Sequence, residues 1–102
     1  MLEERKAEDI LLLDVHEVTI LADYFVICSA NSERQIRALG GDLSRQLKAD
    51  VGRPLHTEGQ PDGGWVLMDY GDVIVHIFAP KVREMYDLEG FWSEAQTIVR
   101  IQ

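Results

Sequence analysis

The chain is short and acidic. It has 102 residues, with ten basic and eighteen acidic side chains and a net charge of −8. A chain of this length forms a single domain, residues 1–102, and buries only about 60–70% of the surface it exposes when unfolded. Because few basic side chains are left to neutralise phosphates, we expect no direct nucleic-acid binding. The charge favours a basic protein partner or, equally, nothing more than solubility.

Cysteine content and hydropathy indicate a cellular location. The single cysteine, Cys28, excludes an intrachain disulfide and is typical of a reducing compartment. No apolar run approaches the ~20 residues of a membrane-spanning helix. The charged N-terminus is not followed by the apolar stretch of a secretory signal. We therefore expect a cytoplasmic protein that does not interact with membranes.

The first quarter of the chain predicts two strands. Residues 2–8 are charged and compatible with the frayed end of a short helix. Residues 10–15 are almost continuously apolar, which is typical of a strand buried on both faces, although a buried helical turn gives the same pattern. Residues 24–28 are rich in aromatic and β-branched side chains and predict a second strand.

The most regular pattern predicts a helix over about residues 32–50. Ser32 and Gln35 have the spacing of a capping box, in which each side chain satisfies a free backbone N–H. Apolar residues then recur at steps of three and four, namely Ile36, Leu39, Leu43 and Leu47. Gly40 and Gly41 inside this helix each cost about 1 kcal/mol relative to alanine. Close packing of the helix on a sheet is the simplest compensation.

The centre of the chain predicts a hairpin. Residues 55–58 are compatible with an edge strand, and 59–64 form a turn-rich loop. Residues 65–69 and 73–79 read as two strands. Because only Tyr70-Gly71 and one more residue separate them, they should pair antiparallel.

The last segment predicts one helix and a tail. Met85, Leu88 and Trp92 recur at helical spacing and indicate a helix over about residues 82–93. Residues 94–102 carry few signals and are expected to be a mobile tail, which leaves a core of about 8–93. This order of elements predicts an α/β fold: a mixed β-sheet of about five strands flanked by helices.

The sequence does not predict a metal site. His16, His56 and His76 are widely separated, and with Cys28 they make at most four nitrogen or sulfur ligands in the whole chain. A structural zinc site needs four such ligands together. We therefore expect neither a metal nor a cofactor.

Nucleophilic catalysis is also not indicated. Cys28 ends an apolar strand, where a cysteine usually contributes packing. His76 shares a strand face with Ile74 and Phe78, which favours a hydrogen-bonded core histidine over a catalytic one. No nucleophile-elbow motif is present.

The alternative to a binding protein is a nucleotide-using enzyme. The turn that contains Ser29 and Ser32 is similar to the strand-to-helix turn of nucleotidyltransferases, and a helix N-terminus favours anions. Those enzymes also need two metal-binding carboxylates at i and i+2 on one strand. The nearest acidic pairs here are Asp69 with Asp72, which flank a turn, and Asp87 with Glu89, which diverge by roughly 200° on a helix. The hypothesis of a nucleotide-binding or nucleotidyltransferase-type enzyme therefore requires atypical metal ligands.

Aromatic and acidic residues concentrate in the second half of the chain. We predict that these residues bind a partner: Trp65, Asp69, Tyr70, Asp72, Tyr86 and Glu89. Tryptophan and tyrosine often dominate the binding energy of interfaces, and carboxylates beside them suit an arginine- or lysine-rich protein. The competing interpretation is that Trp65 and Trp92 belong to the core. We favour the core for Trp92 and the surface for Tyr70, so that Tyr70→Ala should weaken docking more than Asp72→Ala.

Three segments together resemble a known family. The segments are ADYFVICS (residues 22–29) followed by NSERQI (31–36), WVLMDYGDVIVHIF (65–78), and REMYDLE (83–89) with Trp92. In this order they resemble the signatures of the ribosomal silencing factors, the RsfS/Iojap family. The resemblance covers most of the chain, from about Glu8 to Trp92.

The resemblance implies both a fold and a function. The fold would be nucleotidyltransferase-like without the catalytic carboxylates, and the protein would not be an enzyme. The partner would be the large ribosomal subunit, contacted through a basic ribosomal protein at the subunit interface. Bound there, the factor would sterically block joining of the small subunit and repress translation. Family members are often seen as dimers, so a homodimer is also compatible with the resemblance.

Overall fold

The structure is a computed structural model that describes residues 7–17, 19–20, 22–48, 52–91 and 96–101. Its strands are β1 (Glu8–Asp14), β2 (Tyr24–Ser29), β3 (His56–Gln60), β4 (Trp65–Asp69), β5 (Val73–Phe78) and β6 (Gln96–Ile101). Its helices are α1 (Glu33–Leu47), the short 3-10 helix η2 (Pro61–Gly63), α2 (Pro80–Tyr86) and α3 (Leu88–Phe91).

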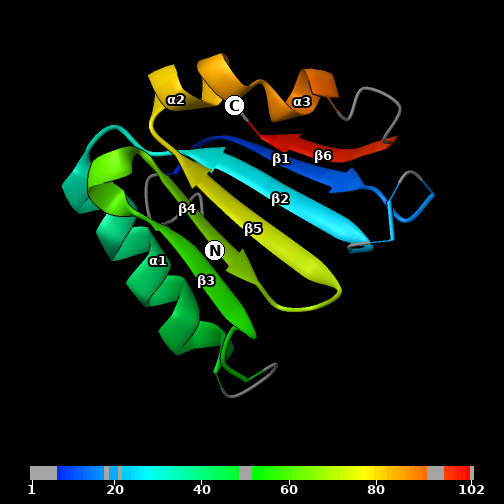
Figure 1. Cartoon of the computed structure of the whole chain (residues 1–102), viewed down its shortest axis with the longest axis horizontal. Coiled ribbons are helices and arrows are strands. Elements are labelled where there is room, and N and C mark those ends of the chain that lie inside the picture. The colour runs from blue at the N-terminus through cyan, green and yellow to red at the C-terminus, as the bar shows by residue number, and fades with distance from the viewer. Residues whose placement is uncertain (1–6, 18, 21, 49–51, 92–95, 102) are drawn as a thin grey trace.

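The strands form one mixed sheet, as expected. Their order is β3-β4-β5-β2-β1-β6 (Figure 1). β2 and β5 run parallel, whereas the other neighbouring pairs run antiparallel, including the predicted hairpin of β4 and β5. β3 lies at one edge of the sheet, also as predicted.

The sixth strand corrects the expectation of a mobile tail. Gln96–Ile101 pairs antiparallel with β1, and Val99 lies opposite Leu12. Its described side chains, from residue 97 on, are exposed, so the segment lacks the strong alternation that marks a half-buried strand in sequence. Its β-branched residues Thr97, Ile98, Val99 and Ile101 favour an extended strand, a signal that the expectation of a tail overlooked, and pairing with β1 holds the strand in place.

Helix α1 begins at the predicted cap. The Ser32 hydroxyl accepts a hydrogen bond from the backbone N–H of Gln35 (3.1 Å), and the Gln35 side chain accepts one from the backbone N–H of Asn31 (2.8 Å). The expected reason for the glycines inside the helix is wrong. A Cβ at Gly40 would lie 4.0 Å from the Met68 sulfur, which is ordinary van der Waals contact, so no close approach requires glycine there.

The sheet lies between α1 on one face and α2 and α3 on the other (Figure 1), and each face carries an apolar core. One core joins α1 to the sheet and contains Ile36, Leu39 and Leu43 from the helix. The other core lies on the opposite face, contains Phe25 and Phe78, and is flanked by residues of α2 and α3. Side chains alternate between the faces along each strand, so neighbours in sequence contribute to different cores.

The predicted helix 82–93 is two shorter helices. α2 begins earlier, at Pro80, where proline is favoured in a first turn. It ends at Asp87, which adopts a left-handed conformation with φ +48°, and the Asp87 carboxylate accepts a hydrogen bond from the backbone N–H of Gly90 (3.2 Å). Trp92, expected in the core, lies outside the described residues.

The structure describes only the end of the predicted N-terminal helix, residues 7 and 8. Of the helix predicted over residues 2–8, positions 2–6 lie outside the described part, and Glu8 belongs to β1 instead. Among the described residues, no helix combines the length and apolarity that crossing a membrane requires.

Candidate functional site

An aromatic cluster lies on the α2 side of the sheet. The Trp65 ring stacks on Phe78 with centroids 5.0 Å apart and contacts Tyr86 of α2 at 4.8 Å. The indole Nε1–H donates a hydrogen bond to Nδ1 of His76 (3.2 Å). Two neighbouring strands and α2 thus fix the orientation of Trp65.

His76 is the buried centre of this cluster. Its side chain packs edge-on against Phe25 with ring centroids 5.1 Å apart, and only 4% of the residue is exposed. Burial lowers the pKa of His76 to about 4, so the imidazole is neutral at physiological pH. Because Nδ1 accepts from Trp65, Nε2 carries the proton. The predicted core histidine is therefore confirmed.

The cluster reaches the surface beside the edge strand. Tyr86 is 52% exposed, and all residues of β3 are exposed. Between β3 and β4 lies a hollow of about 150 Å³, lined by Glu58, Gly59, Trp65 and Leu67. We call these four residues together with Tyr86 the Trp65 surface.

Tyr70 and Asp72 lie elsewhere. They follow β4 at the end opposite Trp65, and the Tyr70 ring packs against the α1 core, on the other face of the sheet. They line a second hollow, of about 380 Å³, whose other walls are Val26, Leu43, Leu47, Val73 and Val75. The structure therefore does not bring the predicted partner-binding residues into one continuous patch.

Tyr70 was expected at the surface, and the structure places it there only in part. The residue is only partly exposed, and its hydroxyl is buried without a hydrogen-bond partner among the described residues. Burial also raises the pKa of the Tyr70 hydroxyl.

The Asp69 carboxylate forms a hydrogen bond within its own turn, because it accepts from the backbone N–H of Gly71 (2.7 Å). Glu89 belongs to α3, and its side chain lies outside the described part.

The hydroxyls of both serines in the turn between β2 and α1 already form hydrogen bonds. Ser29 accepts a hydrogen bond from Nη1 of the buried Arg83 (2.9 Å), which also donates to the carbonyl oxygen of Asp9 (2.7 Å). Ser32 caps α1. These contacts give both hydroxyls structural roles and weaken the hypothesis of a phosphate-binding turn. Sequence reasoning missed Arg83, because nothing local marks it as buried.

Cys28 contributes to the packing of the core, as predicted. Its thiol is fully buried in the core beneath α1, and burial raises its pKa to about 12. A thiol with so high a pKa carries almost no thiolate at neutral pH, and the thiolate is the nucleophilic form.

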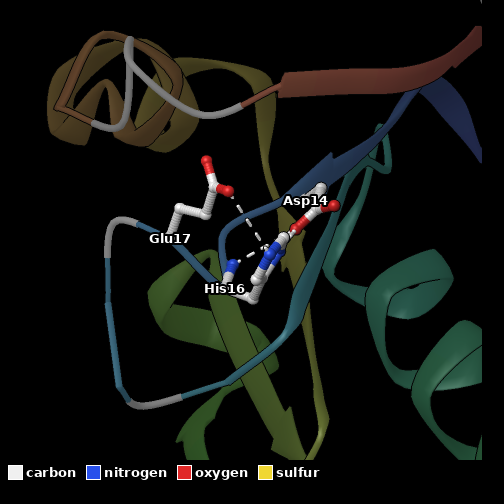
Figure 2. Close-up of polar contacts among 3 residues, drawn as sticks. All are labelled: Asp14, His16 and Glu17. Carbon is white, nitrogen blue, oxygen red and sulfur yellow. Dashed lines mark hydrogen bonds and ion pairs between the residues drawn. The ribbon is translucent and has the colours of Figure 1, made fainter.

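A polar cluster, separate from the aromatic one, lies at the turn after β1 (Figure 2). His16 contacts the carboxylate of Asp14 through Nδ1, and its Nε2 lies 3.8 Å from Glu17. The Asp14 hydrogen bond raises the pKa of His16, and the same contact lowers the pKa of Asp14. Within the described ranges, no three His, Cys, Asp or Glu side chains come together as metal ligands.

Sequence comparison identifies the family. The family model described as "Ribosomal silencing factor during starvation" matches residues 1–102. The chain belongs to this family. The resemblance drawn from the three sequence segments is therefore confirmed.

Individual members of the ribosomal silencing factor family are similar over most of the chain. The Bacillus subtilis ribosomal silencing factor RsfS is 39% identical over 91% of this chain and 79% of its own length. The mouse protein named mitochondrial assembly of ribosomal large subunit protein 1 is 31% identical over 91% of this chain and 42% of its own. A solved structure from Chromobacterium violaceum superposes with a TM-score of 0.84 at 40% identity, covering 90% of this chain and 77% of that one.

Proposed function

We propose that this protein binds the large ribosomal subunit through a basic ribosomal protein at the subunit interface and sterically blocks joining of the small subunit. Translation would fall because fewer complete ribosomes form. The family described as silencing factors supports this proposal, as does the mouse relative whose name refers to assembly of the large subunit. The net charge of −8 suits a basic partner.

The observation that carries the proposal is the contact of Trp65 with Tyr86. Partly exposed aromatic rings that are already held in place lose little conformational freedom on binding, and such rings are typical anchors of protein interfaces. The Trp65 surface combines this pair with the exposed edge strand β3. We infer that it is the main contact, and that Asp69, Tyr70, Asp72 and Glu89 contribute less.

Separated ribosomal subunits provide the test of function. The purified protein is added under conditions that favour joining, and the mixture is resolved on a sucrose gradient. We expect the protein to travel with the large subunit and the joined-ribosome peak to fall. A protein that stays at the top of the gradient, with joining untouched, would show the proposal to be wrong.

Three tyrosine variants locate the contact. Tyr86→Ala removes an anchor of the Trp65 surface, and we expect it to weaken binding by at least about tenfold, the effect typical of an interface anchor. Tyr24→Ala is a matched control, because Tyr24 is also partly exposed (37%) but lies on β2. Tyr70→Ala tests the contact first expected from sequence. A larger loss with Tyr70→Ala than with Tyr86→Ala would place the contact on the α1 side.

The structure offers less support for the enzymatic alternative. The family resemblance implies a nucleotidyltransferase-like fold without catalytic carboxylates, and both hydroxyls of the turn that would hold phosphate already form hydrogen bonds within the fold. Titration with nucleotide and magnesium, followed by thermal unfolding, separates the two functions. Nucleotide at 100 times its Kd would stabilise the fold by about 2.7 kcal/mol. We expect no shift at millimolar nucleotide.

A further inference from the structure

The hollow on the Trp65 surface has the chemistry of a binding site for one side chain. We propose that it receives the cationic side chain of a lysine or arginine from the basic partner. This inference rests on the proposed function and deepens it, because it names the group that the Trp65 surface recognises. The hollow measures about 150 Å³ and lies next to the edge of the sheet.

Gly59 lets the two strands beside the hollow approach closely. Its φ of +86° lies in the left-handed region, and a Cβ built there would lie 2.1 Å from the carbonyl oxygen of Trp65. Any other residue would therefore force the backbone of β3 away from β4. The close approach of the two strands at Gly59 therefore fixes the spacing of the walls that Glu58 on β3 and Trp65 and Leu67 on β4 provide.

The remaining walls match the parts of a long cationic side chain. Leu67 and the indole ring of Trp65 are apolar and suit a methylene stem. The Trp65 Nε1–H already donates to His76, so the indole offers its ring to a ligand rather than its polar group. Because Phe78 and Tyr86 already contact the ring, the part of the indole that lines the hollow offers apolar contact to the stem.

Glu58 supplies the charge that selects a cation. Its side chain is 62% exposed, and its carboxylate contacts His56 Nε2 at 2.9 Å. An ammonium or guanidinium group in the hollow could pair with this carboxylate, whereas a phosphate or carboxylate would be repelled. A purely apolar side chain would desolvate Glu58 without replacing its bonds to water. The occupant that satisfies both the apolar walls and the acidic rim is therefore basic.

Charge reversal at two sites separates this local contact from long-range attraction. Glu58→Lys reverses the charge at the hollow. Glu17→Lys makes the same change in the turn after β1, where the glutamate is also exposed and also lies near a histidine. Both variants have the same net charge and lose the same general attraction to a basic partner. We expect Glu58→Lys to weaken binding to purified large subunits on the order of tenfold more than Glu17→Lys.

A second probe does not depend on the ribosome. N-acetyl-arginine amide is titrated into the full chain, and the Trp65 indole N–H signal is followed by NMR, with Trp92→Phe used for its assignment. We expect the signal to shift with arginine, to shift less with the uncharged citrulline analogue, and not to shift in Glu58→Lys.

The outcomes distinguish the two proposals. Equal losses for the two lysine variants on the ribosome, or equal shifts with arginine and citrulline, would overturn the cation site. An arginine-specific shift in a protein that does not bind large subunits would uphold the site and overturn the proposed function.

Discussion

Acidification is expected to destabilise this fold through His76. Burial lowers the pKa of the folded-state imidazole from 6.5 to about 4. Between these values the unfolded chain binds a proton that the folded chain does not, so stability falls as the pH drops through this window and is fully present above pH 6.5. At 1.36 kcal/mol per pKa unit, the difference corresponds to about 3 kcal/mol. This is a large share of the stability of a domain of this size.

Urea unfolding at a series of pH values between 7 and 4 measures this contribution. The His76→Phe variant keeps an aromatic ring but cannot be protonated, and its loss of the hydrogen bond from Trp65 lowers stability equally at every pH. The carboxylates and His16 are the same in both proteins, so their contributions to the free energy of unfolding cancel in the difference. This holds for His16 even though its raised pKa acts in the opposite sense to the lowered pKa of His76. Parallel curves of unfolding free energy against pH for the two proteins would refute the reasoning.

Three further substitutions test the packing, each through the free energy of unfolding in urea. Gly40→Ala should stabilise the protein by about 1 kcal/mol, because the new methyl group fits against Met68 and the helix loses a flexible residue. A loss of stability would mean that α1 approaches the sheet more closely. Arg83→Met should lower the free energy of unfolding by about 3 kcal/mol, since it leaves the Ser29 hydroxyl and the Asp9 carbonyl oxygen without their donor. A change below the measurement error would contradict these hydrogen bonds. Tyr70→Phe should leave stability unchanged or raise it by up to about 1 kcal/mol, because it removes a buried hydroxyl without a partner among the described residues; a marked loss would reveal a bond to that hydroxyl.

Local sequence signals predicted the elements that carry their own pattern. The capped helix α1 has an apolar stripe of period 3.6, and the β4–β5 hairpin has two apolar runs around a glycine turn. β6 has β-branched residues that favour a strand but lacks the alternation of a half-buried one, because its described side chains are exposed. The break between α2 and α3 was missed for a related reason. It depends on Asp87 adopting a left-handed conformation, which a helical spacing of apolar residues does not reveal.

The candidate site was predicted in its residue types but not in its arrangement. Trp65 and Tyr86 were expected near a partner, and the structure places their rings in contact. Tyr70 was grouped with them because it is close to Trp65 in sequence. It lies five positions further on, at the other end of β4, and an odd separation along a strand puts two side chains on opposite faces.

The sequence by itself determined the family, the acidic character and the strong local elements, because composition and short-range periodicity depend only on the order of residues. Only the tertiary structure decided which side chains meet. The hydrogen bond from Trp65 to His76 requires two strands to pair in one register, and the hollow beside Glu58 requires a third strand at the edge of the sheet. The alternating pattern and the turn set the register within a hairpin, but which distant strands become neighbours in the sheet depends on the packing of the whole chain.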